Sequence, residues 1–135
     1  MKLLGVGEYG KAFMTTNIHD KNLKVAIKVL DKEKLKENGI DCIIEEVAIL
    51  NKLDHPNIVK YYETYDDEKY IYLVMEYIEG QQLFDKITQQ ENQQFGEREA
   101  ANYMEKLFLA INHCHAQSVI HRDIKPENII ITNQG

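Results

Sequence analysis

The chain has few cysteines, few basic residues and no long apolar run. Its two cysteines, Cys42 and Cys114, lack CxxC spacing and paired histidines, so neither a zinc site nor a disulfide framework is expected. There are 16 Lys and Arg against 22 Asp and Glu, a formal net charge of −6, so the basic face that nucleic-acid binding usually needs is not expected. No run of about 18 apolar residues exists, and Gly5 comes too early for a signal peptide. These absences predict a cytoplasmic protein with no nucleic-acid partner and no membrane segment.

The sequence has enough apolar residues for one core. Apolar residues make up 44% of the 135, which supports one domain, or two small lobes that lean on each other. The pattern changes near Gly80. Short β-branched or aromatic runs separated by turns precede it, and helical periodicity follows it over residues 81–118.

The part before Gly80 predicts five strands and one helix. Strands are expected over Leu3–Val6, Lys11–Thr16 and Leu23–Leu30, and then in the runs IVKYYETY and KYIYLVMEY, which form a hairpin. Between the third strand and the hairpin, over 41–53, apolar residues recur at helical spacing at Ile43, Val47, Leu50 and Leu53 and predict a helix. The later part predicts a short helix from about Leu83 and a longer one from Glu97 to His115. The expected apolar face of the longer helix is Met104, Leu107, Phe108, Ile111 and Cys114.

Three glycines near the start fit the pattern GxGxxG. Gly5, Gly7 and Gly10 would let backbone amides approach a phosphate, because no Cβ stands in the way. A dinucleotide-binding fold would open a helix directly after them, whereas KAFMTTN reads as a strand, so a hairpin over phosphates fits better. The alternative is an ordinary glycine-bearing hairpin.

The run VAIK places a lysine beside a small residue. In a strand Ala26 and Lys28 point to one face, and a lysine out of water needs an acidic partner. Glu46, next to the apolar stripe of the following helix, is the expected partner, and Glu45 is the competing choice. The alternative is that all three charges are solvated.

Near the end, HRDIKPEN has the features of a catalytic loop rather than of a strand. It groups a carboxylate, an ammonium and an amide in Asp123, Lys125 and Asn128. His121 is expected to hold this loop by hydrogen bonds rather than to act as an acid or base.

The order of these motifs resembles the eukaryotic protein kinases. GxGxxG, VAIK, a helix glutamate, HPNIV, VMEY and HRDxKPEN follow one another over essentially all 135 residues. The lysine of HRDIKPEN is typical of serine/threonine kinases. The surrounding sequence is similar to that of the calcium/calmodulin-dependent and calcium-dependent kinases. The resemblance implies an α+β fold: a small lobe over 1–75 with a five-stranded antiparallel sheet and one helix, a hinge over 76–80, and the start of a helical large lobe over 81–135.

The same resemblance implies phosphoryl transfer from ATP and Mg²⁺ to Ser or Thr hydroxyls of a protein substrate. Asp123 would accept the hydroxyl proton, Lys125 would neutralise moving charge, and Asn128 would bind a magnesium ion. Lys28 would hold the α- and β-phosphates, and Glu46 would orient it through an ion pair.

An adenine pocket is also implied. It would use apolar side chains and hinge backbone, from Leu4, Ala26, Met75, Glu76, Ile78 and Ile130. Taken singly, these residues could equally belong to a core.

Three departures from the family pattern bear on activity. Ala12 stands where valine is usual, Gln82 where glutamate is common, and no Asp-Phe-Gly follows Asn128. The 135 residues alone are therefore expected to be a fragment of a kinase domain and inactive. The alternative function is a non-catalytic nucleotide-binding or protein-interaction module derived from a kinase.

Overall fold

A computed structural model describes residues 1–7, 10–121 and 123–133, without the side chains of 37 and 38. The middle of the glycine motif and the arginine of HRD therefore lie outside the described residues. Contacts within the chain divide it into two compact units. Unit 1 comprises Met1–Asp54 and Val59–Tyr77, and unit 2 comprises His55–Ile58 and Ile78–Gly135. The change from one to the other after Tyr77 falls within the segment expected to be a hinge.

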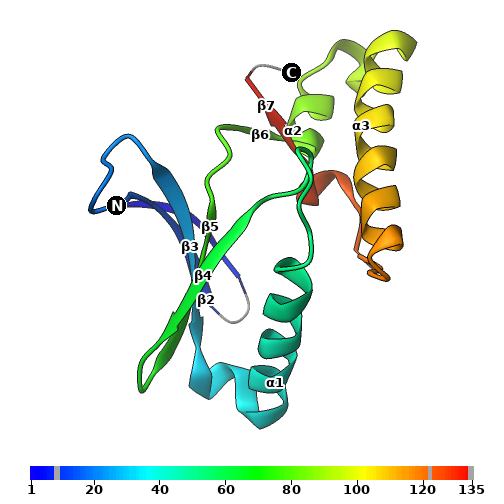
Figure 1. The fold of residues 1–135 in the computed structure, drawn as a ribbon. Helices are drawn as coiled ribbons and strands as arrows, with labels where there is room; N and C mark the ends of the chain where they lie inside the picture. Colours follow the sequence, from blue (N-terminus) through cyan, green and yellow to red (C-terminus); the bar gives the residue numbers. More distant parts are fainter. Residues whose placement is uncertain (8–9, 122, 134–135) are drawn as a thin grey trace. The chain divides into compact units, whose positions relative to one another are not determined.

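Unit 1 is built on the predicted five-stranded antiparallel sheet, which is confirmed (Figure 1). Its strands are β1 (Lys2–Val6), β2 (Gly10–Thr16), β3 (Lys24–Asp31), β4 (Tyr61–Asp66) and β5 (Tyr70–Glu76). Their spatial order is β1-β2-β3-β5-β4, so β5 lies between β3 and β4. Each boundary lies within a few residues of the prediction because alternating apolar runs between turns define these strands.

The core of unit 1 lies between the sheet and its helix α1 (Lys32–Leu50). Leu30 and Leu73 are each only 1% exposed, and Ile71 is buried beside them. Ile43 and Val47 of α1 pack against this cluster, so the predicted apolar face of the helix is confirmed in that part. Burial of such side chains is the main force that holds the helix to the sheet.

The helix begins earlier and ends earlier than the predicted span of 41–53. Asp31 caps it, because its carboxylate accepts a hydrogen bond from the Glu33 N–H at 2.9 Å. Lys36 then departs from helical geometry, with φ 57° and ψ 172°, so that α1 consists of two helical pieces joined at a kink. The sequence prediction missed the first piece because its residues KEKLKEN carry no continuous apolar stripe.

Unit 2 contains the two predicted helices, α2 (Leu83–Thr88) and α3 (Glu97–Ala116), and two short 3₁₀ turns, η1 (Glu91–Gln93) and η2 (Pro126–Asn128). It also contains a two-stranded antiparallel sheet that was not predicted. In that sheet β6 (Gly80–Gln82) pairs with β7 (Ile130–Thr132), and Gln81 lies opposite Ile131. Gly80 is needed there, since a Cβ would come within 2.1 Å of the Ile131 carbonyl oxygen.

The apolar face expected on α3 is only partly covered. Ala110 is buried, and Leu107 and Ile111 are half-buried. Phe108 and Met104, also expected on that face, are 61% and 41% exposed. The helix was therefore predicted correctly, but the set of its buried side chains was not. Helical periodicity shows which residues share a face, but not how much of that face is covered by the rest of the protein.

Two further observations concern the cysteines and the length of the helices. Cys42 and Cys114 are both free thiols. Among the described residues, none of the helices combines the length and the apolar character that crossing a bilayer requires.

Candidate active site

The loop that follows α3 gathers the three polar residues of HRDIKPEN. The Asn128 side-chain amide donates to Asp123 Oδ2 at 3.1 Å, and Lys125 Nζ lies 3.5 Å from the same oxygen. The turn η2 makes this possible, because the Asn128 N–H bonds to the Lys125 carbonyl at 2.9 Å and the chain folds back. Pro126 begins the turn, where its missing N–H costs no hydrogen bond.

Asn128 also bonds to the backbone of Asp123. Its Nδ2 donates to the Asp123 carbonyl oxygen at 2.9 Å, so both amide protons are directed at one residue. Since both donors are engaged, the amide cannot flip without losing two hydrogen bonds. Its Oδ1 is thereby left as an acceptor on the other side of the group.

The charges of this group remain accessible to solvent. The side chains of Asp123 and Lys125 are 63% and 49% exposed. An ion pair with that exposure contributes little to stability, so the pair is better understood as an accessible carboxylate beside a cation than as a structural link. After η2, β7 continues from Ile130 and anchors the end of the loop on β6.

In unit 1 the sheet places several predicted nucleotide-binding residues in neighbouring positions. Ala26 of β3 lies opposite Met75 of β5, and Lys28 lies opposite Ala12 of β2. Residues opposite each other in an antiparallel pair share a face, and so do residues two apart in a strand. Ala26, Lys28 and Met75 therefore share one face, which is the face that α1 covers beside Leu73.

The predicted Lys28–Glu46 ion pair is wrong for this structure. Among the described residues, neither a hydrogen bond nor an ion pair joins Lys28 to Glu46 or to the competing Glu45. All three side chains are exposed. An exposed pair of this kind is worth only about 0–1 kcal/mol, so it does not determine how the helix lies on the sheet. The helix position is set instead by Ile43 and Val47, which face the core.

The three motif glycines have different surroundings. A Cβ on Gly10 would lie 1.7 Å from the Val29 carbonyl oxygen, so the close approach of β2 and β3 requires glycine there. A Cβ on Gly5 would meet nothing within 4 Å, and one on Gly7 would meet only the Gly10 carbonyl oxygen, at 3.7 Å. Packing within the described residues therefore accounts for Gly10 but not for the first two glycines.

The residues expected to contact adenine are only partly enclosed. Leu4 and Ile130 are 42% and 43% exposed, and Glu76 and Ile78 are half-buried. The Glu76 N–H already donates to the Lys60 carbonyl at 2.7 Å, and its carboxylate accepts from the Lys60 N–H at 3.0 Å. Of the Glu76 backbone groups, its carbonyl is therefore the one suited to a hydrogen bond with a base.

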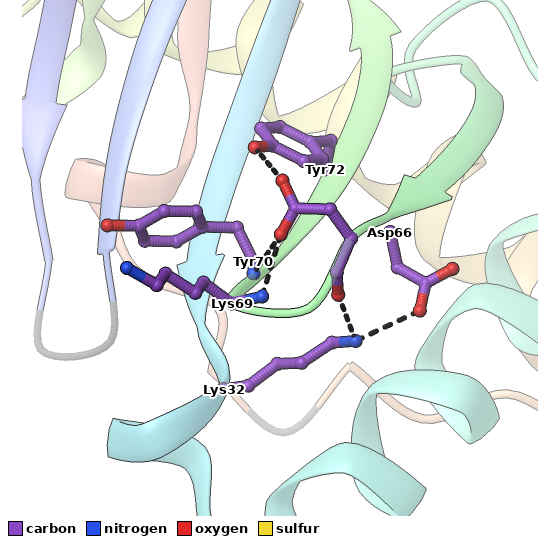
Figure 2. A network of polar contacts seen from close by, with 6 residues as sticks. Lys32, Asp66, Lys69, Tyr70 and Tyr72 are labelled. Atoms are coloured by element: carbon purple, nitrogen blue, oxygen red, sulfur yellow. Dashed lines mark hydrogen bonds and ion pairs between the residues drawn. The ribbon is translucent and has the colours of Figure 1, made fainter.

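A second polar group, missed by the sequence analysis, lies at the β4–β5 turn (Figure 2). The carboxylate of Asp67 accepts from the N–H groups of Lys69 and Tyr70 at 2.8 and 2.7 Å and from the Tyr72 hydroxyl at 2.7 Å. Lys32, in the first turn of α1, donates to the Asp67 carbonyl and pairs with Asp66 at 3.0 Å. The available signal was the aspartate at the start of a turn, a position where its side chain commonly bonds to the backbone two residues later.

These bonds perturb two ionisable groups. The hydrogen bond from Tyr72, followed by those from the Tyr70 and Lys69 backbones, lowers the pKa of Asp67 below its usual range. The same bond raises the pKa of the Tyr72 phenol, since ionisation would place two negative charges side by side. An open depression of about 350 Å³ adjoins the group and includes Glu68, but it contains none of the predicted site residues. We therefore regard it as part of the turn and not as the active site.

Taken separately, the sheet with its glycine hairpin and the loop around Asp123 carry the motifs on which the resemblance to protein kinases rests. Comparison with known protein families gives the same result, because the protein kinase domain matches residues 1–135. The chain therefore belongs to the protein kinase family.

Individual relatives refine this assignment. The chain is 42% identical over 132 residues to calcium-dependent protein kinase 5 of Plasmodium berghei, covering 98% of this chain and 23% of that protein. It is 41% identical over 135 residues to CBL-interacting serine/threonine-protein kinase 12 of Arabidopsis thaliana, covering 99% of this chain and 27% of that protein. It is also 41% identical over 133 residues to Aurora/IPL1-related protein kinase 2 of Caenorhabditis elegans, covering 98% and 43%. The predicted likeness to calcium-dependent serine/threonine kinases is thus confirmed, and the chain spans about a quarter of the length of the first two relatives.

Proposed function

We propose that this chain is part of an ATP-dependent protein kinase that transfers phosphate to Ser or Thr hydroxyls of a protein substrate, in the cytoplasm. The observation that carries the proposal is the group formed by Asp123, Lys125 and Asn128, in a chain that belongs to the protein kinase family. Phosphoryl transfer depends mainly on positioning and charge neutralisation, which a fixed carboxylate and a nearby cation supply.

The roles of two residues follow from their chemistry. The exposed carboxylate of Asp123 accepts the proton of the attacking hydroxyl. Lys125, 3.5 Å from that carboxylate, neutralises negative charge on the transferred group.

The donor atoms of the loop fit magnesium in part. Asn128 Oδ1 is a neutral oxygen ligand of the kind that Mg²⁺ accepts, and its orientation is fixed by the two bonds to Asp123. A bound magnesium ion would supply charge neutralisation for the phosphates. Within the described ranges there is no grouping of three or more His, Cys, Asp or Glu suited to a metal, so these residues hold the ion only together with phosphate and water oxygens or with further ligands.

For nucleotide binding we propose the face of unit 1 that carries Ala26, Lys28 and Met75. Lys28 is exposed and without an acidic partner in the described structure, so its ammonium is available to phosphate oxygens. The open space at Gly5 leaves room for a phosphate to approach the backbone, whereas the Gly7 N–H already donates to the Gly10 carbonyl oxygen at 2.8 Å. Leu4 and the Glu76 carbonyl are the further adenine contacts that we propose within unit 1.

Nucleotide binding can be tested without any transfer reaction. Calorimetric titration of the 135-residue chain with magnesium-ATP is expected to show weak binding that Lys28→Met removes. Lys11→Met is the matched control, because Lys11 is also exposed but lies opposite Val29 and thus on the other face of the sheet. Equal heats for wild type and Lys28→Met would contradict the proposed site.

The reaction is tested by transfer of radiolabelled phosphate to a generic basic peptide. Asn128 is the one magnesium ligand that we propose from this chain, and the loss of a strong electrostatic contact commonly costs about 10²-fold or more in rate, so transfer by the 135 residues is expected to be slow. Asp123→Asn should abolish the remaining transfer, while Asp85→Asn, an exposed carboxylate in α2, should not. ATP binding combined with transfer that is indifferent to Asp123 would favour the non-catalytic nucleotide-binding alternative.

A further inference from the structure

The open depression beside the β4–β5 turn combines aromatic rings with carboxylates. Its volume is about 350 Å³, and it is lined by Asp67, Glu68, Lys69, Tyr70 and Tyr72. The rings of Tyr70 and Tyr72 are tilted by 61° to one another, with their centroids 6.3 Å apart. These two residues are two apart in β5, so both rings lie on one face of the sheet next to the turn.

This face is not the one proposed to bind nucleotide. Side chains alternate along β5, so Tyr72 points away from the side on which Ile71 and Leu73 join the core with α1. Met75, one of the proposed nucleotide contacts, lies on the same side as Leu73. A ligand in the depression would therefore bind apart from the nucleotide.

The hydrogen bonds of the turn leave acceptors beside the rings (Figure 2). The Tyr72 hydroxyl donates its proton to Asp67 Oδ2 at 2.7 Å, so its oxygen can only accept from a ligand. Asp67 is ionised at neutral pH, because the Tyr72 hydroxyl and two backbone N–H groups lower its pKa. Among the described residues, no hydrogen bond or ion pair engages the exposed carboxylate of Glu68. These groups favour a ligand with positive charge and N–H donors.

Two lysines near the depression bear on the charge of a ligand. Lys32 Nζ lies 3.0 Å from Asp66 Oδ2, so these two charges offset each other. Lys69 lines the depression and would repel a cation, but the carboxylates of Asp67 and Glu68 outweigh its single charge. The lining as a whole is therefore acidic.

The surroundings suit a side chain that another protein presents. Tyr65 of β4 lies opposite Tyr72 and is 56% exposed, so the aromatic surface extends beyond the depression. Aromatic residues and arginine are enriched where proteins meet. The formal net charge of −6 adds a long-range attraction for a basic partner.

We propose that this depression binds the guanidinium group of an arginine from a partner protein. A planar guanidinium stacks on a tyrosine ring and donates through its N–H groups to Glu68 and to the Tyr72 oxygen. A lysine ammonium has no planar face to stack. A quaternary ammonium has no N–H donors and needs an enclosing aromatic cage, whereas this depression is open and has two rings.

The test is a titration of the ¹⁵N-labelled 135-residue chain, followed by NMR, with a short glycine peptide that contains one arginine. The same peptide with citrulline is the matched control, because citrulline has nearly the same shape and no charge. We expect the arginine peptide to shift the backbone signals of Lys69 and Tyr70 and to bind about tenfold more tightly than the citrulline peptide. A peptide with lysine should bind about two- to fivefold more weakly than the arginine peptide.

Variants of the chain identify the groups that bind. Glu68→Gln should weaken binding of the arginine peptide by about two- to fivefold without disturbing the fold, since its carboxylate is exposed and unpaired in the described structure. Tyr70→Leu removes a ring and should have an effect of similar size. Lys69→Met should strengthen binding, because it removes a like charge. Glu45→Gln is the matched control, an exposed carboxylate of α1, and should leave the affinity unchanged.

Each alternative result has a defined meaning. Absence of shifts at Lys69 and Tyr70, equal affinity for the arginine and citrulline peptides, or wild-type binding by Glu68→Gln would overturn the proposal. A lysine peptide that binds as tightly as the arginine peptide would refute the choice of a guanidinium. Lys28→Met should not alter peptide binding, so this inference and the proposed nucleotide site can fail independently of each other.

Discussion

At the scale of single residues, the glycine motif shows that one pattern can have two physical causes. Gly10 is required by the fold, because a side chain there would collide with the backbone of β3. Gly5 has open space beside it, so packing within the described residues does not explain why this position is a glycine. Phosphate binding is the requirement we propose.

This difference predicts opposite results for two alanine substitutions. Gly10→Ala should lower the free energy of unfolding by about 1–3 kcal/mol, since β2 and β3 must separate to admit the Cβ. Gly5→Ala should change it by less than about 1 kcal/mol and should instead weaken magnesium-ATP binding. Urea unfolding followed by circular dichroism, together with calorimetry, measures both effects. A large loss of stability in Gly5→Ala would show that this glycine has a structural role.

The Asp67 group gives a prediction about pH. The pKa of Asp67 is lower in the folded chain than in the unfolded chain, chiefly because of the Tyr72 hydroxyl. Its contribution to stability is therefore present above the unfolded value, about 3.9, and is lost as pH falls through the folded pKa. The pKa of Tyr72 is raised, so the contribution of its protonated form is present below about 10 and is lost as pH rises through the folded value.

Unfolding in urea at pH 6 and pH 3 tests this linkage. Tyr72→Phe removes the main cause of the Asp67 shift, so its stability should fall less between the two pH values than that of wild type. Tyr70→Phe is the control, because in the described structure Tyr70 bonds to Asp67 through its backbone N–H and carbonyl, which the substitution keeps. The interpretation fails if both phenylalanine variants show the same loss of stability between pH 6 and pH 3.

At the scale of elements, the kink in α1 is a site of backbone strain. Lys36 has φ 57° and ψ 172°, a region that residues with a Cβ rarely occupy and that costs about 1–3 kcal/mol. The strain is offset by what lies on either side, since Leu35 is buried in the core and Ile40 packs against it. The kink therefore lets both pieces of α1 reach the same apolar cluster.

Glycine at position 36 should relieve this strain. Lys36→Gly is expected to raise the free energy of unfolding by about 1 kcal/mol, which is the relief of strain less the added freedom of the unfolded chain. Lys36→Ala keeps a Cβ and should bring no such gain. Denaturant unfolding of the two variants side by side decides the question, and a stability of Lys36→Gly at or below that of Lys36→Ala would count against strain at the kink.

The elements also differ in how far the sequence could predict them. The strands of unit 1 could be predicted because β-branched alternation and turns lie within each local segment. The start of α1 could not, because its evidence is a capping bond at Asp31 and one buried leucine, Leu35, rather than a stripe. The sheet of β6 and β7 was missed because each strand has only three residues and Gln81 and Gln82 give β6 no apolar alternation.

At the scale of the whole molecule, the same distinction between local and distant contacts governs the candidate site. The grouping of Asp123 with Lys125 and Asn128 could be expected from the sequence, because one turn of backbone brings them together. Whether Lys28 pairs with Glu46 could not be predicted from the sequence, because it depends on how α1 packs on the sheet. That packing is determined by apolar contacts of other residues. The family resemblance suggested the pair, and the described structure does not contain it.

The pairing of β6 with β7 bears on the order in which the chain acquires its structure during synthesis. Strands β1 to β5 and helix α1 all precede Gly80, so the sheet of unit 1 can form as soon as β5 has emerged from the ribosome. Strand β6 emerges directly afterwards, but its partner β7 follows only after α2 and α3 have been made. Until then the edge of β6 has unpaired backbone groups and the loop with Asp123 lacks its anchor. The nascent chain therefore acquires the sheet proposed to bind nucleotide well before it can order the loop with the proposed base. A pause in translation between the two would leave a chain that has the proposed binding sheet but not the proposed catalytic loop.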